Sequence, residues 1–271
     1  MQNDFVLMSQ KDIWYGQFPA FSAAGFLTAC SCRLHGESDL VPGMFNLALH
    51  VGDDPVKVLA NRQRFAQAID VDPARFTTCA QVHGNQVAVV TEAEIGCGAL
   101  DPSKTIVGTD ALVTQLPDVP LLLFYADCTP VLLADPVTGA IGLAHAGWRG
   151  TAGLIAQKTV ETMVQQFGVR RENLLGAIGP CIGGCCYEVD DVVQKQLPGY
   201  ERFFEPKGEG KYWLDLARVN AQQLLEAGLD RNHVFLSGIC TNDHHELFCS
   251  YRYEKGKTGR MGVCLCRTIG L

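Results

Sequence analysis

Short apolar runs, each followed by turn-forming residues, fill the middle of the chain. Residues 131–134 and 140–144 are apolar, and residues 135–139 between them include Asp, Pro and Gly. This pattern predicts two strands joined as an antiparallel hairpin. Because the outer ends of a hairpin meet at one edge, Cys128 before the first strand and His145 after the second are expected to be neighbours.

Helical spacing of apolar residues is clearest over residues 151–167, where one broad face is apolar. Residues 53–69 start with two aspartates and a proline, which is typical of a helix N-terminus. Two more helices are predicted over 189–197 and 214–227. Further strands are predicted over 24–29, 77–82, 86–91, 110–114, 120–125, 174–178, 233–236 and 261–266, and residues 92–108 are expected to form a loop that lies over a pocket.

The strands are grouped before and after a few helices, without the regular alternation of parallel βαβ units. This order favours the α+β class. The 271 residues contain no stretch with the composition of a linker, so a single domain over residues 1–271 is expected. A chain of this length can bury a sizeable core.

Composition narrows the classes of function. Hydrophobic residues make up 47% and charged residues 19%, which is typical of a globular protein and not of a disordered one. The net charge of −7 argues against a nucleic-acid partner. The most apolar stretch, residues 119–126, is too short to span a membrane. No secretory signal is visible, so the 12 cysteines are expected to be reduced thiols in the cytoplasm.

Two histidines and a cysteine form the first candidate site. His83 and His145 each lie beside small residues at a predicted strand end, and Cys128 precedes a neighbouring strand. One thiolate and two imidazoles suit Zn²⁺, and three protein ligands leave a fourth position open for catalysis. The same atoms also suit a metal-free nucleophilic dyad, in which the imidazole of His145 activates Cys128. Both interpretations remain open at this point.

Polar residues outside this trio give weaker indications. Arg33 and Arg149 lie in predicted loops, and a guanidinium group is suited to binding phosphate. Asn46 is a polar residue within an apolar run, so it is either a buried amide or a substrate contact. The loop 179–188 contains three cysteines, but two of them are adjacent, which is poor geometry for chelating one ion. A structural turn is therefore favoured for this loop.

Several motifs, taken in order, resemble those of the laccase-domain proteins, once called multicopper polyphenol oxidases and now regarded as zinc-dependent purine nucleoside phosphorylases. His145 to Gly150 reads His-Ala-Gly-Trp-Arg-Gly, and 126–128 reads Ala-Asp-Cys, a combination with high specificity. One departure is His35, where the family commonly has glycine. The remaining motifs lie at 46–54, 81–84, 110–114, 178–182, 250–252 and 258–260.

The resemblance implies a single α+β domain with mixed β-sheets layered between helices. It also implies a Zn²⁺ ion held by His83, Cys128 and His145, with copper binding in vitro. The implied reaction is phosphorolysis of adenosine, inosine, guanosine and methylthioadenosine, with adenosine deamination as a side activity. In this scheme the partners are purine nucleosides and phosphate, and no oligomeric state is implied.

Individual roles follow as hypotheses. Arg33 and Arg149 are expected to bind phosphate, with Asn46 as a further substrate contact. Asp127, next to Cys128, is expected to carry a proton or to orient the site. Two alternatives belong to other enzyme classes. One is a cysteine hydrolase or deamidase that uses Cys128 and His145 without metal. The other is a copper-dependent phenol oxidase, which the chain's 7 histidines favour less.

Overall fold

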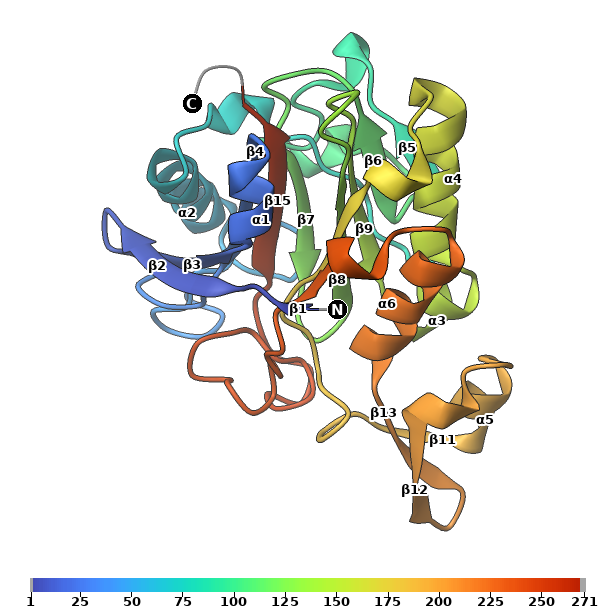
Figure 1. The fold of residues 1–271 in the computed structure, drawn as a ribbon. Helices are drawn as coiled ribbons and strands as arrows, with labels where there is room; N and C mark the ends of the chain where they lie inside the picture. Colours follow the sequence, from blue (N-terminus) through green and yellow to red (C-terminus); the bar gives the residue numbers. More distant parts are fainter. Residues whose placement is uncertain (1, 269–271) are drawn as a thin grey trace.

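Two β-sheets lie face to face in the computed structural model, which describes residues 2–268 (Figure 1). One sheet has seven strands in the order β1-β14-β10-β8-β9-β6-β5, and the other has five in the order β2-β3-β4-β15-β7. A small third sheet has the order β11-β13-β12. The strands are β1 (Gln2–Asn3), β2 (Val6–Gln10), β3 (Ile13–Gln17), β4 (Phe26–Ser31), β5 (Val87–Val89), β6 (Ala111–Thr114), β7 (Leu121–Tyr125), β8 (Thr129–Ala134), β9 (Ile141–Ala146), β10 (Leu175–Ile178), β11 (Glu188–Asp190), β12 (Phe204–Gly208), β13 (Lys211–Leu214), β14 (Val234–Leu236) and β15 (Met261–Arg267).

Helices cover the outer faces of the two large sheets. Helix α2 packs against the five-stranded sheet through Phe65 and its neighbours. On the far side, α4 and α6 pack against the seven-stranded sheet through residues such as Val160 and Leu224. These layers confirm the predicted α+β class with sheets between helices. The helices are α1 (Pro19–Ala23), α2 (Pro55–Ala68), α3 (Trp148–Ala152), α4 (Ile155–Phe167), α5 (Asp191–Lys195) and α6 (Leu216–Glu226).

The central strands β6 to β10 are buried at every position and mostly apolar, because both of their faces are covered. In β7, Leu121 and Leu123 enter the core between the sheets, whereas Leu122 and Phe124 pack toward α2. Side chains alternate between faces with a period of two, so a strand buried on both sides reads as a continuous apolar run. Strands β8 and β9 are likewise buried on both faces. Their antiparallel pairing confirms the predicted hairpin.

The chain crosses from one large sheet to the other within three residues. Strand β7 belongs to the five-stranded sheet and β8 to the seven-stranded sheet, and only Ala126, Asp127 and Cys128 connect them. Asp127 has φ of 82°, a left-handed conformation that is uncommon for a residue with a side chain. The tight crossing thus fixes Cys128 at the junction of the two sheets.

Strand β15 occupies a central place in the five-stranded sheet. It pairs with β4 on one side and with β7 on the other, both antiparallel. In Figure 1 it runs as the dark red arrow beside β7. Strand β7 is therefore attached to its own sheet through a strand that lies far from it along the chain.

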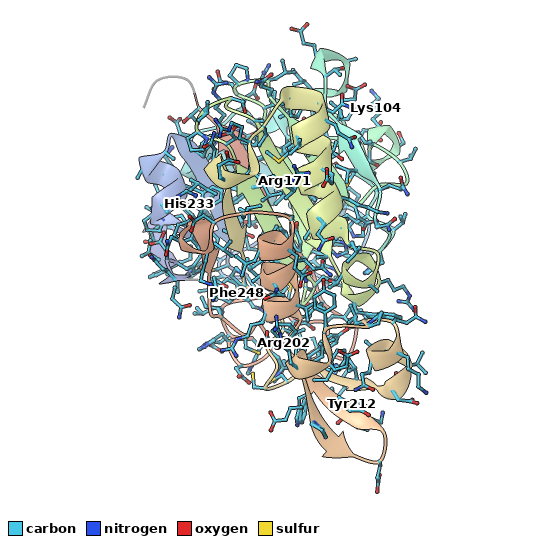
Figure 2. All side chains as sticks on the ribbon, turned by 45° about the vertical axis from the view of Figure 1, so that its right-hand side comes forward. Lys104, Arg171, Arg202, Tyr212, His233 and Phe248 are labelled. Carbon is cyan, nitrogen blue, oxygen red and sulfur yellow. The ribbon has the colours of Figure 1, made fainter. Side chains whose placement is uncertain are left out.

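The third sheet forms a projection with its own small core. Strands β11, β12 and β13 and helix α5 extend away from the large sheets, with Tyr212 on the projecting hairpin (Figure 2). Its buried residues include Val189, Leu197 and Phe204, packed against the start of α6. The helix predicted over 189–197 is wrong in part, because residues 188–190 pair as a strand and only 191–195 are helical.

The helix predicted over 151–167 is interrupted. Leu154 has φ of 61° and separates α3 from α4. The break is held by Asn85, whose side-chain amide donates to the carbonyl of Gly153 at 2.8 Å. Residues 77–82, predicted as a strand, make only the isolated bridges Thr77–Leu121 and Cys79–Ile106. Strands β1 to β3 and the β12–β13 hairpin were not predicted, since they are short or largely exposed.

None of the helices within residues 2–268 combines the length and apolar character needed to cross a membrane. In the same part of the chain each cysteine is a free thiol.

A buried carboxylate, that of Asp53 in the motif at 46–54, ties this motif to the loop at residues 38–40. Asp53 accepts hydrogen bonds from Ser38 Oγ at 2.6 Å, Asn46 Nδ2 at 2.9 Å and the backbone N–H of Asp54 at 3.0 Å. Burial opposes its ionisation, but these hydrogen bonds outweigh burial and hold its pKa below the usual value. The carboxylate form is therefore the one that the fold stabilises.

We expect Asp53→Asn to lower the free energy of unfolding by about 2–3 kcal/mol at pH 7, because hydrogen bonds to a charged group are lost. A depressed native pKa stabilises above the unfolded pKa of about 3.9, and this stabilisation disappears as pH falls through the native pKa. Urea unfolding from pH 7 to pH 3 should show the two proteins converging below about pH 4. Asp12→Asn, at an exposed carboxylate, is the control; a pH-independent gap would contradict the prediction.

Candidate metal centre and its cavities

His83, Cys128 and His145 meet at the junction of the two large sheets. Their ligand atoms all lie within 4.8 Å of one another. The two imidazole rings are 4.9 Å apart between centroids and inclined by 79°. Residues that are 45 and 17 positions apart along the chain are thus brought together, as the hairpin pattern predicted for Cys128 and His145.

Each member is positioned by a different backbone feature. Cys128 ends the crossing between the sheets, and His145 lies on β9 opposite Pro130 of β8. His83 lies in the bend before β5, with φ of 58°. Non-glycine residues in the left-handed region carry local strain that the surrounding structure must offset, and such residues concentrate at functional sites.

A single carboxylate, that of Asp110, orients both histidines. Asp110 Oδ1 lies 2.9 Å from His145 Nδ1, and the carboxylate also accepts from the backbone N–H groups of Val82, His83 and Gly84 at 3.2, 2.9 and 2.7 Å. Asp110 thus fixes the bend that carries His83 and the ring orientation of His145. With Nδ1 engaged, Nε2 of His145 is the atom available to a metal ion.

Gly147 leaves room for the other two members. A Cβ atom at this position would lie 3.2 Å from Cys128 Sγ and 3.3 Å from His83 Cδ2. Both distances are tighter than ordinary van der Waals contact, so any side chain here would press on the trio. The glycine in the His-Ala-Gly-Trp-Arg-Gly motif therefore lets Cys128 and His83 pack closely against the backbone.

Electrostatics favours ionised forms within the trio. Burial opposes ionisation of the Cys128 thiol, but the charge on His145 and hydrogen bonds from both imidazoles outweigh it and lower its pKa. Burial likewise disfavours the imidazolium of His145, but the Cys128 thiolate and Asp110 raise its pKa. A thiolate with two imidazoles matches the donor set of Zn²⁺ and of copper, so the three residues fit a metal ion.

Two cavities meet at the trio. The larger has a volume of about 600 Å³, within the range of small-molecule sites, and is lined by all three members. The smaller has a volume of about 180 Å³ and is lined by His83 and Cys128 but not by His145. Asp127, Ile182 and Tyr187 line both cavities. The candidate metal centre therefore lies where the two spaces join.

Arginines without a carboxylate partner line these cavities. Arg149 lies at the smaller one, where its guanidinium carbon is 4.3 Å from the Trp148 ring centroid. Arg252 and Arg260 line the larger one, and their guanidinium groups donate to backbone carbonyls at 2.9–3.5 Å. None of the three forms a salt bridge with the described residues, so positive charge is left for an anion.

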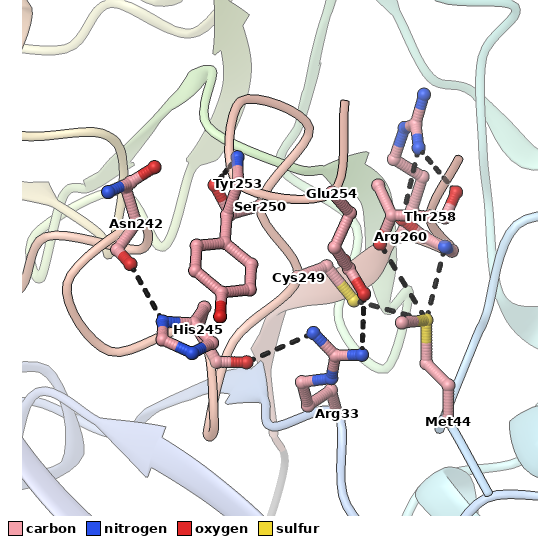
Figure 3. A network of polar contacts seen from close by, with 11 residues as sticks. Arg33, Met44, Asn242, His245, Cys249, Ser250, Tyr253, Glu254, Thr258 and Arg260 are labelled. Carbon is pink, nitrogen blue, oxygen red and sulfur yellow. Dashed lines mark hydrogen bonds and ion pairs between the residues drawn. The ribbon is translucent and has the colours of Figure 1, made fainter. Parts of the chain in front are cut away.

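Arg33 and Asn46 lie outside both cavities. The guanidinium group of Arg33 donates to Glu254 at 2.7 Å and to the carbonyl of His245 at 3.0 Å (Figure 3). Asn46 is fully buried, and its amide oxygen accepts from the backbone N–H groups of Ala48 and Arg260 at 3.0 and 2.9 Å. Their assignment as substrate contacts stays a prediction; the observed bonds tie loops together.

Asp127 connects three segments around the trio. Its carboxylate accepts from Thr241 Oγ1 at 2.7 Å and from the backbone N–H of Arg252 at 2.6 Å, and its carbonyl accepts from Ile182 at 2.9 Å. Both carboxylate oxygens are thus already engaged. Of its two predicted roles, this arrangement matches orientation of the site more closely than proton transfer.

Asp110, Tyr187 and Arg260 belong to the site but were not predicted for it. Asp110 and Arg260 lie in the quoted motifs at 110–114 and 258–260, which is the one signal that marked them. Tyr187 lies within the cysteine-containing loop 179–188 and carried no signal of its own. The contribution of each residue to the site can be recognised only in the three-dimensional structure.

Comparisons with known proteins agree with this architecture. The family model described as "Multi-copper polyphenol oxidoreductase laccase" matches residues 27–268. Purine nucleoside phosphorylase YlmD of Geobacillus stearothermophilus is 40% identical over 243 residues, which is 88% of this chain and 89% of that protein. The protein of the same name from Bacillus subtilis is 36% identical over 220 residues, covering 80% and 79%.

Solved structures give the same result. The crystal structure of YlmD from Geobacillus stearothermophilus matches with a TM-score of 0.93 and 36% identity, covering 97% of this chain and 99% of that one. The Bacillus licheniformis hypothetical protein YfiH matches with a TM-score of 0.89 and 33% identity, covering 93% and 96%. The resemblance predicted from the motifs is confirmed.

Proposed function

We propose that this chain, which belongs to the multi-copper polyphenol oxidoreductase laccase family, cleaves purine nucleosides with inorganic phosphate. The reaction breaks the bond between the sugar C1 and the purine nitrogen, joins a phosphate oxygen to C1, and releases the free base and ribose 1-phosphate. The observation that carries the proposal is the meeting of a large and a small cavity at the trio, with unpaired arginines around them. Relatives named purine nucleoside phosphorylase support it.

Zn²⁺ is the metal that we propose for His83, Cys128 and His145. Three protein ligands leave the fourth coordination position open toward the cavity, where a substrate atom could bind, as in catalytic zinc sites. When bound, the ion would supply a Lewis acid that polarises a substrate oxygen or nitrogen. Asp110 contributes by holding His145 in one tautomer, and Gly147 by leaving the ligands their space.

The two cavities suggest separate places for the two substrates. The purine nucleoside would occupy the larger cavity, where Phe124, Tyr187 and Tyr251 offer aromatic surface for the base. Phosphate would be held at the smaller cavity by Arg149, with Arg252 and Arg260 adding positive charge from the other side. Phosphate would then be held on one side of the sugar and the departing purine on the other, and this positioning lowers the barrier. The arginines would stabilise the negative charge of the phosphate while the bond between the sugar and the purine breaks.

Finer parts of the proposal come from the family resemblance. Adenosine, inosine, guanosine and methylthioadenosine are the proposed nucleosides, and deamination of adenosine is a proposed second reaction. Asp127 is proposed to orient Cys128 and the cavity walls. The proposed compartment is the cytoplasm, which suits a chain with 12 cysteines that are all unpaired within the described residues.

Base release from inosine should depend strictly on phosphate, and equal amounts of base and ribose 1-phosphate should form; chromatography measures both. Arg149→Met should raise KM for phosphate by about 10-fold or more, because a charge-assisted contact is lost. KM for inosine should change little. Arg170→Met is the control, since that exposed arginine pairs with Glu172. Base release without phosphate would contradict the proposal.

A metal-free cysteine hydrolase is the second candidate, because the Cys128 thiol has a lowered pKa beside His145. It predicts full activity after metal removal, with complete loss when Cys128 is alkylated. A copper-dependent phenol oxidase is less well supported, since only two of the 7 histidines lie at the trio.

A further inference from the structure

A second group of metal-type ligands lies outside the catalytic trio. Cys185, Cys186, Cys240 and Asp243 place one ligand atom each within 4.8 Å of the others. Three sulfur atoms and one carboxylate are the donor types of a four-coordinate structural zinc site. We propose that these four residues, called the cysteine cluster below, bind a second Zn²⁺ ion that holds the cavity wall in place.

The adjacent cysteines both reach one carboxylate despite their poor spacing in sequence. Cys185 Sγ lies 3.0 Å from Asp243 Oδ2, and Cys186 Sγ lies 2.9 Å from Asp243 Oδ1. The turn that allows this begins at Gly183, whose carbonyl accepts from the N–H groups of Cys186 and Tyr187 at 3.0 and 2.9 Å. The chain curls so that two successive thiols face the same point.

The third sulfur is held against this turn by the backbone. Residues Cys181 and Cys240 form a parallel bridge, and the N–H of Gly183 donates to Cys240 Sγ at 3.2 Å. A Cβ on Gly183 would lie 3.1 Å from Cys185 Sγ and 3.3 Å from Cys240 Sγ. Glycine at this position therefore lets two sulfur atoms approach, and its N–H supplies the kind of hydrogen bond that supports a metal-bound sulfur.

The dimensions of the cysteine cluster fit a zinc ion. Zinc–sulfur bonds of about 2.3 Å at tetrahedral angles place sulfur atoms about 3.8 Å apart, so a group whose ligand atoms already lie within 4.8 Å needs only a small rearrangement. Cys185 and Asp243 are exposed, which gives an ion a direct route from solvent, whereas Cys240 is buried. On binding, the thiols release their protons to solvent, and no oxidation is involved.

The cluster joins the two segments that form one wall of the catalytic cavities. Ile182 and Tyr187 flank the cysteine turn and line both cavities. On the other segment, Thr241 lies next to Cys240 and donates to Asp127. An ion that clamps Cys185 and Cys186 to Cys240 therefore fixes Tyr187 relative to Asp127. This role concerns structure and requires no chemistry at the second ion.

Metal counting tests the proposal on the full chain, reduced and supplied with Zn²⁺ alone. Native mass spectrometry should find two zinc ions per wild-type chain. A Cys185→Ser/Cys240→Ser double variant should retain one, and a Cys128→Ala variant should retain the other. Cys97→Ser, at a half-buried thiol outside both groups, should keep two. One ion in the wild-type chain, with no loss in the double variant, would overturn the proposal.

Two further measurements exclude indirect explanations. Asp243→Asn, at an exposed position, leaves all thiols in place and should weaken zinc binding at the cluster by more than about tenfold. Co²⁺ added to the Cys128→Ala chain should give intense thiolate-to-cobalt absorption that the triple variant with Cys185→Ser and Cys240→Ser lacks. A wild-type chain that is lighter by two hydrogens and binds no ion at the cluster, with no such mass loss in the Cys185→Ser/Cys240→Ser variant, would instead identify a disulfide in the cluster and contradict the metal site.

Discussion

Cys128→Ala should lose the metal ion of the trio and nucleoside turnover together. The variant removes the one anionic ligand and leaves two imidazoles without a thiolate between them. Removing a residue that only hydrogen-bonds to a metal ligand typically lowers metal affinity or activity about 10–100-fold. Removing a ligand itself should do more, so zinc affinity and turnover should fall by more than about 100-fold. Isothermal titration with Zn²⁺ and an inosine phosphorolysis assay measure the two effects on the same sample.

The control for this variant is Cys264→Ala, which removes a fully buried thiol on the other side of the five-stranded sheet. It should lower stability modestly and leave both readouts unchanged. Full phosphorolysis by metal-free Cys128→Ala would contradict the proposed role of the trio. Loss of turnover by this variant, combined with a wild-type chain that is active without metal, would favour the cysteine hydrolase.

Asp110→Asn should have the second largest effect. It removes a carboxylate that accepts from His145 and from three successive backbone N–H groups. Zinc affinity at the trio should fall by about 10–100-fold, because His83 and His145 lose their common support. The free energy of unfolding should fall by about 2–4 kcal/mol, since hydrogen bonds to a buried charge are lost. Zinc titration and urea unfolding measure these changes separately.

Asp135→Asn is a matched control, because it replaces another fully buried carboxylate, located in the turn of the β8–β9 hairpin and not beside His145. Asp135 accepts from the N–H of Val137 and from Thr138 Oγ1 at 3.0 and 2.8 Å. Its replacement should reduce stability without changing zinc affinity. Equal losses of zinc affinity in both variants would mean that Asp110 acts only through general stability.

Much of the layered core could be predicted from the sequence because its strands are apolar on both faces. The β8–β9 hairpin combines two apolar runs with a clear turn, and that pattern alone is enough to predict Cys128 beside His145. The break in the 151–167 helix could not be predicted, since Leu154 fits the helical spacing and the contact that holds the break comes from Asn85. The interaction that decides this local structure is 68 residues away.

The candidate site, like the core, could be predicted only in part. His83, Cys128 and His145 have distinctive chemistry and lie beside strands predicted from the sequence, so the pattern is enough to propose them as metal ligands, and the structure brings them together. Asp110 looks in sequence like any residue before a strand, and its role depends on the bend at 82–84 folding over it. For the cysteine loop, the adjacency of Cys185 and Cys186 favours a structural turn. The other half of the cluster, Cys240 and Asp243, enters through tertiary contacts that the local sequence does not contain.

The central position of β15 has a consequence for how the protein is made. β7 pairs with its sheet through residues 261–265, which leave the ribosome long after β7 itself. Cys128 lies three residues after β7. The connection between the two sheets at residues 126–128 should therefore reach its final position only after β15 has been synthesised. Domains commonly begin to fold during synthesis, but non-local strand pairing waits for both strands. Metal loading of the trio should therefore come late, and nascent chains that stop before β15 should emerge without the ion.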